Sequence, residues 1–212
     1  MCQTRSGVAV KISESEIRIY MSDDDSHNTI REEHHLRDDD GPLASRQTPV
    51  EFVPATDLLD LDTWEFVFDD SHPDWWTDSM TEQAVRQFKA DLSPKIEHLK
   101  DTGVWDGCLV LHGKKLPAGT ELIVTIGGDA RFPRLTDASG LEALVTIGGD
   151  ADFSRLTDAS GLEALATIGG YAYFSNLTDA SGLKSLTTIG RYADFSSLTD
   201  AVRKALFVRI GQ

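Results

Sequence analysis

Residues 32 to 35 combine carboxylates and imidazoles, side chains that could bind a metal ion or transfer protons: Glu32, Glu33, His34 and His35. Because adjacent residues on a helix or a strand point in different directions, we interpret this run as a solvated charged segment. Residues 23–25 are three aspartates and resemble the start of a calcium-binding loop. That loop has glycine at its sixth position and glutamate at its twelfth. This chain has Asn28 and His34 there, which argues against a calcium site.

The chain lacks the short motifs that mark common catalytic and cofactor sites. It contains no G-x-x-x-x-G-K-[ST] phosphate loop, no G-x-G-x-x-G dinucleotide fingerprint, no H-E-x-x-H zinc motif and no G-x-S-x-G nucleophile elbow. We therefore expect no enzymatic activity, no cofactor and no metal site. The alternative is an enzyme with its site in the first hundred residues. It would need a pocket that gathers carboxylates with His27, His34, His35 or His72.

Negative charge is concentrated in the first half of the chain. The formal net charge is −15, and residues 1–110 hold 24 acids against 10 bases, whereas residues 111–212 hold 11 acids against 10 bases. Between residues 14 and 82 there are 20 acids and only four bases. Such a surface repels nucleic acid and anionic membranes and attracts basic protein surfaces. We expect a basic protein or nucleoprotein partner, and no direct contact with nucleic acid or membrane.

These acids could occupy a site that normally binds DNA. Duplex DNA presents one negative charge per roughly 1.7 Å of axis, and proteins that bind it offer lysine and arginine to match. Two neighbouring tryptophans could anchor an arginine-rich partner if exposed, or form core between two domains if buried. The alternative for the charge is that it only keeps the protein in solution. The candidate partner-binding residues are Asp23, Asp24, Asp25, Asp38, Asp39, Asp40, Asp69, Asp70, Asp74, Trp75, Trp76 and Asp78.

The second half of the chain repeats every 21 residues. Residues 125–145 read TIGGDARFPRLTDASGLEALV, and nearly the same sequence returns at 146–166 and 167–187, with a fourth copy from residue 188. A divergent copy, residues 104–124, precedes them. Within a repeat, Ala130 and Phe132 alternate as in a short strand, while Asp129 and Arg131 are expected to face solvent. Stacking in parallel would bury an apolar edge that one copy cannot bury alone.

Two further features of the repeats predict local structure. An aspartate recurs in each turn, at positions 137, 158, 179 and 200, and we expect it to cap its own turn by accepting backbone amides. After residue 200 the repeat gives way to a segment with helical spacing. Its apolar face would consist of Val202, Ala205 and Leu206, and the helix would close the stack.

The first hundred residues do not repeat. Alternating apolar residues predict a hairpin over 9–20 and strands at 50–53 and 64–68. Residues 22–49 are expected to form a long polar loop with short helical turns around 30–36. A helix is predicted over 81–99, with Thr81 as its N-cap and a break or kink at Pro94.

The predicted fold class is α+β. An acidic N-terminal α/β domain, residues 1–103, precedes a right-handed parallel β-solenoid of about five 21-residue coils with a C-terminal helical cap, residues 104–212.

Two segments carry a resemblance to known proteins. The L-x-x-L-x-x-I core formed by Leu141, Leu144 and Ile147 resembles leucine-rich repeats, and the I-G-G corner resembles repeats of receptor-type L domains and of short bacterial and phage solenoids. The buried asparagine of the standard leucine-rich repeat is missing. The segment FVFDDSHPDWWTDSMTEQAV, residues 66–85, is similar to small phage and prophage proteins. This resemblance implies a phage or prophage origin, and with it a location in the host cytoplasm.

Charge and resemblance together suggest a function. The leading hypothesis is a non-enzymatic inhibitor that binds a basic, nucleic-acid-handling host protein through the acidic domain. Its concrete form is an anti-CRISPR protein that partly mimics nucleic acid and binds a CRISPR effector. The alternative is a scaffold or adaptor that holds a protein partner on the solenoid through Tyr171, Tyr173 and Tyr192. The sequence leaves a monomer and a homodimer open, and we expect both cysteines to be reduced thiols in a cytoplasmic protein.

Overall fold

The computed structural model describes residues 5–22, 26–36 and 44–211. The chain divides into two compact units, Met1–Ile96 and Glu97–Gln212. The long helix α2 (Asp78–Thr102) begins in the first unit and ends in the second.

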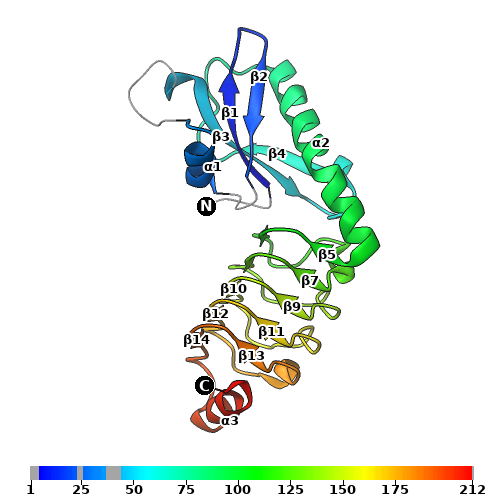
Figure 1. Ribbon diagram of the computed structural model, residues 1–212, viewed down its shortest axis with the longest axis vertical. Helices are drawn as coiled ribbons and strands as arrows, with labels where there is room; N and C mark the ends of the chain where they lie inside the picture. The colour runs from blue at the N-terminus through cyan, green and yellow to red at the C-terminus, as the bar shows by residue number, and fades with distance from the viewer. Residues whose placement is uncertain (1–4, 23–25, 37–43, 212) are drawn as a thin grey trace. The chain divides into compact units, whose positions relative to one another are not determined.

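The first unit contains a four-stranded antiparallel sheet (Figure 1). The hairpin predicted over residues 9–20 is present, and so are the strands predicted at 50–53 and 64–68. Strand β3 is longer than expected. The strands lie in the order β2-β1-β3-β4, and their bounds are β1 (Arg5–Lys11), β2 (Ile17–Tyr20), β3 (Gln47–Pro54) and β4 (Trp64–Phe68).

Helices cover both faces of this sheet. On one face Phe88 of α2 stacks on Phe52 with ring centroids 5.6 Å apart. On the other face Val8 and Val10 of β1 form a buried cluster with Ile30 of the short helix α1 (His27–Glu33). Cover on both faces explains why residues 5–10 are all buried, a pattern without the alternation of a half-exposed strand. Two 3₁₀ turns, η1 (Ala44–Arg46) and η2 (Leu61–Thr63), precede β3 and β4.

Helix α2 begins earlier and ends later than the sequence predicted. It begins at Asp78, so Thr81 lies inside the helix, where its hydroxyl accepts a hydrogen bond from the Trp76 indole (2.9 Å). The helix also continues through Pro94 to Thr102, so of the break or kink predicted at the proline, the break does not occur.

Glutamine side chains of α2 protect the edge strand β2. Gln83 accepts a hydrogen bond from the Ile17 amide (3.2 Å) and donates one to the Ser15 carbonyl (2.8 Å). One helical turn later, Gln87 accepts from the Ile19 amide (2.8 Å) and donates to the Ile17 carbonyl (3.3 Å). Each glutamine side-chain amide therefore forms hydrogen bonds with the backbone of the edge strand as a neighbouring strand would. This limits pairing of β2 with another chain.

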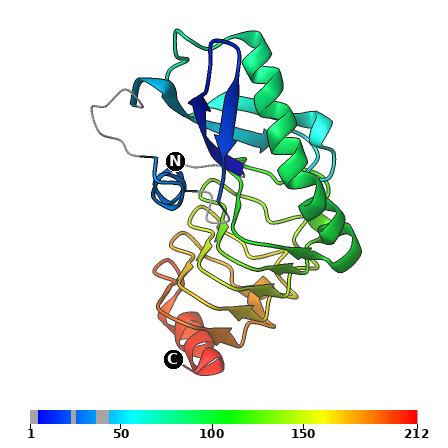
Figure 2. The same ribbon diagram turned by 45° about the horizontal axis from the view of Figure 1, so that its top comes forward.

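The second unit is a parallel β-solenoid of about four turns (Figure 2). Two ladders of two-residue strands run along it, in the orders β13-β11-β9-β7-β5 and β14-β12-β10-β8-β6. Equivalent residues align across the turns, and Ala130, Ala151, Ala172 and Ala193 are paired in register, as the repeat predicted.

The strands of the first ladder are β5 (Val104–Trp105), β7 (Thr125–Ile126), β9 (Thr146–Ile147), β11 (Thr167–Ile168) and β13 (Thr188–Ile189). Those of the second are β6 (Leu109–Val110), β8 (Ala130–Arg131), β10 (Ala151–Asp152), β12 (Ala172–Tyr173) and β14 (Ala193–Asp194). Two 3₁₀ turns, η3 (Thr120–Leu122) and η4 (Ser181–Leu183), lie between strands.

A column of four buried phenylalanines fills the solenoid core. Phe153 and Phe174 stack at 5.2 Å between ring centroids, and Phe174 and Phe195 at 5.3 Å. Phe132 contacts Phe153 edge-on at 5.4 Å. The other apolar residues of the repeat at 125–145 that line the core are also buried: Ile126, Leu135, Ala138, Leu141 and Leu144.

The repeated aspartates act largely as the sequence predicted. Asp137, Asp158 and Asp179 each accept a hydrogen bond from the backbone amide two residues later, at 2.8–3.0 Å. Asp129, by contrast, was expected simply to face solvent. It is half-buried and accepts the Asp150 amide of the next turn (2.7 Å), so it links two turns of the solenoid.

The capping aspartates make acid stability predictable. Hydrogen bonds from the Ser139 hydroxyl and amide lower the pKa of Asp137, and hydrogen bonds from the Ser181 amide and hydroxyl lower the pKa of Asp179. A lowered pKa in the folded state means that each carboxylate stabilises the fold above its unfolded pKa of about 3.9 and loses that contribution as pH falls through the folded value. We expect Asp137→Ala/Asp179→Ala to lower the free energy of unfolding at pH 7.

The same double substitution should have a progressively smaller effect below about pH 4, because the stabilisation from each wild-type carboxylate is lost as pH falls from the unfolded pKa through the lower folded pKa. Urea unfolding at a series of pH values measures this. Truncation of the exposed Lys184 to alanine is the control, and its effect should not follow the same pH profile. An effect of the double substitution that is equal at pH 7 and pH 2.5 would contradict the prediction.

Helix α3 (Asp200–Ile210) ends the solenoid, as expected, but a different face is buried. Leu206 and Ile210 are buried, whereas Val202 is 44% exposed and Ala205 is also exposed. The Phe207 ring meets the Phe195 ring edge-on at 6.1 Å, which extends the aromatic column of the core. The buried face is thus rotated about one residue position around the helix from the predicted one. Of the predicted face, Leu206 is buried, whereas Val202 and Ala205 are not.

Candidate functional site

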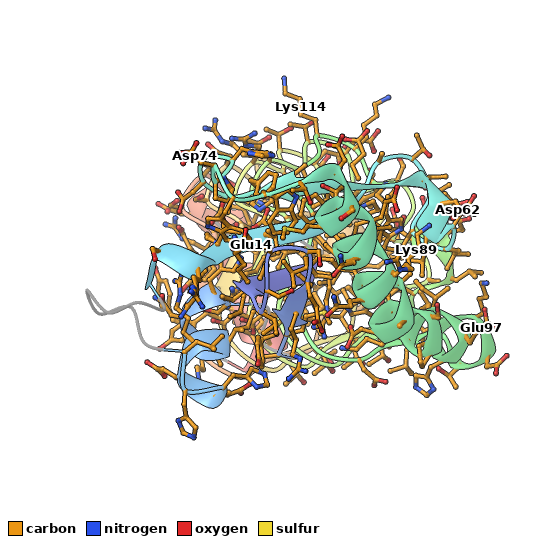
Figure 3. The ribbon with its side chains drawn as sticks, turned by 90° about the horizontal axis from the view of Figure 1, so that it is seen from above. Glu14, Asp62, Asp74, Lys89, Glu97 and Lys114 are labelled. Atoms are coloured by element: carbon orange, nitrogen blue, oxygen red, sulfur yellow. The ribbon has the colours of Figure 1, made fainter. Side chains whose placement is uncertain are left out.

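The clearest candidate surface is the acidic segment, residues 69–78, which joins β4 to the first turn of α2. Its four aspartates, Asp69, Asp70, Asp74 and Asp78, are exposed. Among the residues that the structure describes, Asp70, Asp74 and Asp78 form no ion pair. Figure 3 shows Asp74 at the periphery of the first unit. Three negative charges therefore face solvent within nine residues, and no cation in the described part of the chain pairs with them.

The two tryptophans of this segment differ in their surroundings. Trp76 is only 5% exposed, and its ring packs on Phe66 at 5.6 Å and Phe68 at 5.0 Å between centroids. It belongs to the core of the first unit, so we leave it out of the candidate surface. Trp75 is half-buried, 5.6 Å from Trp76, with the Lys11 ammonium 6.0 Å from its ring centroid. Of these two tryptophans, Trp75 is the one that is partly exposed to solvent.

Several other acids of the first unit serve the fold itself. Asp57 and Asp60 accept backbone amides two residues later, at 2.8 Å and 3.0 Å. Asp62 forms an ion pair with Lys89 of α2, as Figure 3 shows, and this hydrogen bond and charge lower the pKa of the Asp62 carboxyl. Asp91 accepts a hydrogen bond from the nearly buried Arg5 at 2.8 Å. Net charge therefore overstates how many acids are available to a partner.

The other aspartates predicted to bind a partner are Asp23, Asp24, Asp25, Asp38, Asp39 and Asp40, and they lie outside the described residues. The charged run at 32–35 is exposed at the end of α1, where His34 contacts the Met21 carbonyl at 3.0 Å.

The tyrosines predicted to form a second surface do gather on the solenoid. Tyr171 and Tyr173 are stacked at 6.1 Å between ring centroids, and the Arg191 guanidinium lies 5.3 Å from the Tyr171 ring centroid. Tyr192 is 66% exposed and Tyr173 38%. Because Ala172 pairs with Ala193, the preceding residues Tyr171 and Tyr192 are neighbours on adjacent turns.

Sequence reasoning missed a cluster of possible metal ligands in the first unit. His27, Glu51 and Asp69 each offer one ligand atom, and these atoms lie within 4.8 Å of one another. The sequence suggests His27 only as one of the histidines that a catalytic pocket could gather. The sequence does contain one indication of this cluster. Glu51 places a carboxylate between the apolar residues Val50 and Phe52 of a buried strand.

Comparison with known proteins identifies no relative. No family model matches the chain, and no curated protein or solved structure gives a significant match. In the described part of the chain, no helix has both the length and the apolar character that crossing a membrane requires.

Proposed function

We propose that this protein is a non-enzymatic inhibitor that binds a basic, nucleic-acid-handling protein through the acidic segment. The observation that carries the proposal is the exposure of Asp70, Asp74 and Asp78 with no ion pair among the described residues. Acids used for folding, such as Asp57 and Asp60, are held by local hydrogen bonds. Asp70, Asp74 and Asp78 keep their charge available for lysine and arginine on a partner.

Trp75 adds a contact suited to such a partner. A half-buried indole offers a fixed aromatic face, and arginine binds such faces while also pairing with neighbouring carboxylates. The partner that fits is a nucleoprotein complex whose DNA channel is rich in lysine and arginine, of which a CRISPR effector is the concrete case. In this proposal the solenoid consists of five right-handed, leucine-rich-repeat-like coils. It serves as a rigid arm or as a second contact surface.

Neutralising the acidic segment tests the proposal. We expect Asp70→Asn/Asp74→Asn/Asp78→Asn to weaken binding to a DNA-binding CRISPR effector complex about tenfold, since each exposed charge pair contributes roughly 0.5 kcal/mol. Wild-type protein should compete with duplex DNA for the complex, and raising the salt concentration should reduce the difference between wild type and variant. Binding is measured by surface plasmon resonance at two salt concentrations.

The matched control removes three negative charges from the second unit, Glu97→Gln/Asp101→Asn/Glu121→Gln. All three residues are exposed, so net charge changes equally but its location differs. An equal loss of affinity in both triple variants would show that overall charge, and not the acidic segment, determines binding. Unchanged affinity in the acidic-segment variant would refute the proposal.

A second candidate function is supported by the tyrosine surface. Exposed tyrosines are favoured at protein interfaces because they bury large area at little entropic cost. The neighbouring positions of Tyr171, Tyr173 and Tyr192 would suit a scaffold that holds a protein partner on the solenoid. In the same experiment, Tyr173→Ala/Tyr192→Ala should abolish binding if the scaffold is correct and leave it unchanged if the acidic segment makes the contact.

A further inference from the structure

His27, Glu51 and Asp69 bring three potential metal ligands together from three separate elements. His27 is the first residue of α1, Glu51 lies in the middle of β3, and Asp69 directly follows β4. The His27 Nδ1 and Asp69 Oδ2 atoms are 3.4 Å apart, and no two of the three ligand atoms are separated by more than 4.8 Å. Both His27 and Glu51 are buried, and the Asp69 side chain is 28% exposed.

The register of the sheet places the two carboxylates on one face. Glu51 pairs with Val67, and the Asp69 amide donates to the Pro49 carbonyl (3.3 Å), so Asp69 lies opposite a residue two positions from Glu51. Residues two apart on a strand share a face. Pro49 also pairs with Val8, which packs against α1, so this is the face on which His27 lies.

The orientation of the His27 ring favours a metal ligand at Nδ1. The other ring nitrogen, Nε2, lies 3.4 Å from the Val50 carbonyl oxygen, which can only accept a hydrogen bond. A neutral ring that donates from Nε2 to this oxygen presents the Nδ1 lone pair toward Asp69. A ligating histidine whose second nitrogen donates to a backbone carbonyl is the usual arrangement around a bound metal.

We propose that these three residues bind one divalent transition-metal ion, with Zn²⁺ as the best fit. Zinc bonds of about 2.0–2.1 Å in tetrahedral geometry place neighbouring ligand atoms about 3.4 Å apart, which matches the Nδ1–Oδ2 distance. One imidazole with two carboxylates suits zinc better than Mg²⁺ or Ca²⁺, which prefer oxygen ligands alone. The partly exposed Asp69 gives the ion a route to the site.

Bound metal would join α1 to β3 and to the end of β4. Binding therefore stabilises the folded first unit, because the three ligands are far apart in the unfolded chain. Asp69 belongs both to this cluster and to the acidic segment, but the metal proposal does not depend on the inhibitor function, since it needs no partner protein and rests on no contact of Asp70, Asp74 or Asp78.

Metal binding by the full-length protein tests the proposal. The protein is stripped with a chelator and titrated with ZnCl₂, MgCl₂ or CaCl₂ by isothermal calorimetry, in a Cys2→Ser background so that this thiol does not capture zinc. We expect one Zn²⁺ per chain, a rise in the thermal midpoint with zinc, and no comparable binding of Mg²⁺ or Ca²⁺. Asp69→Asn and His27→Gln should each weaken zinc binding at least about 100-fold, the upper range for losing even an outer-shell partner.

The matched controls are Asp70→Asn and His34→Gln, which change the same residue types at exposed positions nearby. Both should keep zinc affinity within about twofold of wild type. Asp69 is partly exposed, so Asp69→Asn provides the decisive comparison if His27→Gln fails to fold. A wild-type protein that takes up no stoichiometric zinc, or an Asp69→Asn variant that binds as tightly as Asp70→Asn, would overturn the proposal.

Discussion

Phe174→Ala is expected to lower the free energy of unfolding of the solenoid by about 3–5 kcal/mol, the range for truncating a buried aromatic residue. Phe174 is fully buried in the middle of the aromatic column, with Phe153 stacked on one side and Phe195 on the other. Removing the ring leaves a cavity and also ends both stacking contacts. The backbone around Phe174 is held in register by ladders on both sides, so the turns cannot readily collapse into the space.

Urea unfolding monitored by circular dichroism measures this loss. Tyr192→Ala is the matched control, because it removes an aromatic side chain of similar size from an exposed position on a neighbouring turn, where substitutions usually change stability by less than about 0.5 kcal/mol. Phe174→Leu should have an intermediate effect, since it keeps much of the buried volume. Equal effects of Phe174→Ala and Tyr192→Ala would mean that the column does not hold the turns together.

The architecture of the solenoid was predictable because its information is local and repeated. Each 21-residue copy carries the same inward residues, and stacking identical copies in register is the arrangement that buries all of them. The alignment of Ala130, Ala151, Ala172 and Ala193 follows directly from that repeat. Capping by Asp137 was predictable for the same reason, because its hydrogen-bond partner lies only two residues away.

Features that depend on contacts between distant residues could not be predicted in this way. The face of α3 that is buried depends on how the helix packs on the last turn of the solenoid. Helical spacing alone wrongly placed Val202 on that buried face. The extension of α2 back to Asp78 accompanies a contact between Trp76 and Thr81 that propensity does not encode. The aspartate link between turns, from Asp129 to the Asp150 amide, likewise requires knowledge of the stacking distance.

The cluster of possible metal ligands could not be predicted for the same reason. His27 and Asp69 are 42 positions apart in the sequence, and they approach only because α1 packs on the sheet face that β4 also reaches. A single sequence offers no reason to connect them. The acidic segment was visible from the sequence, but its division between the buried Trp76 and the half-buried Trp75 depends on core packing.

Gly169→Ala is expected to destabilise the solenoid by at least about 3 kcal/mol, at the upper end of the usual cost of overpacking. A Cβ atom at this position would lie 2.1 Å from the carbonyl oxygen of Gly148 on the preceding turn. The clash is with backbone, which is fixed by the hydrogen bond from the Gly169 amide to the Ile147 carbonyl (2.8 Å). Relief therefore requires adjacent turns to separate, which weakens the ladder along with the core.

The turn that contains Gly127 offers a matched control for this steric effect. A Cβ atom at Gly127, the equivalent position one turn before Gly148, would have no neighbour closer than 3.5 Å. Gly127→Ala should therefore be neutral, or stabilising by up to about 1 kcal/mol because alanine restricts the unfolded chain. Thermal and urea unfolding of both variants separate the two explanations for the glycines. If Gly127→Ala and Gly169→Ala destabilise the solenoid equally, the glycines are needed for backbone conformation. If only Gly169→Ala destabilises it, glycine is needed because adjacent turns approach closely.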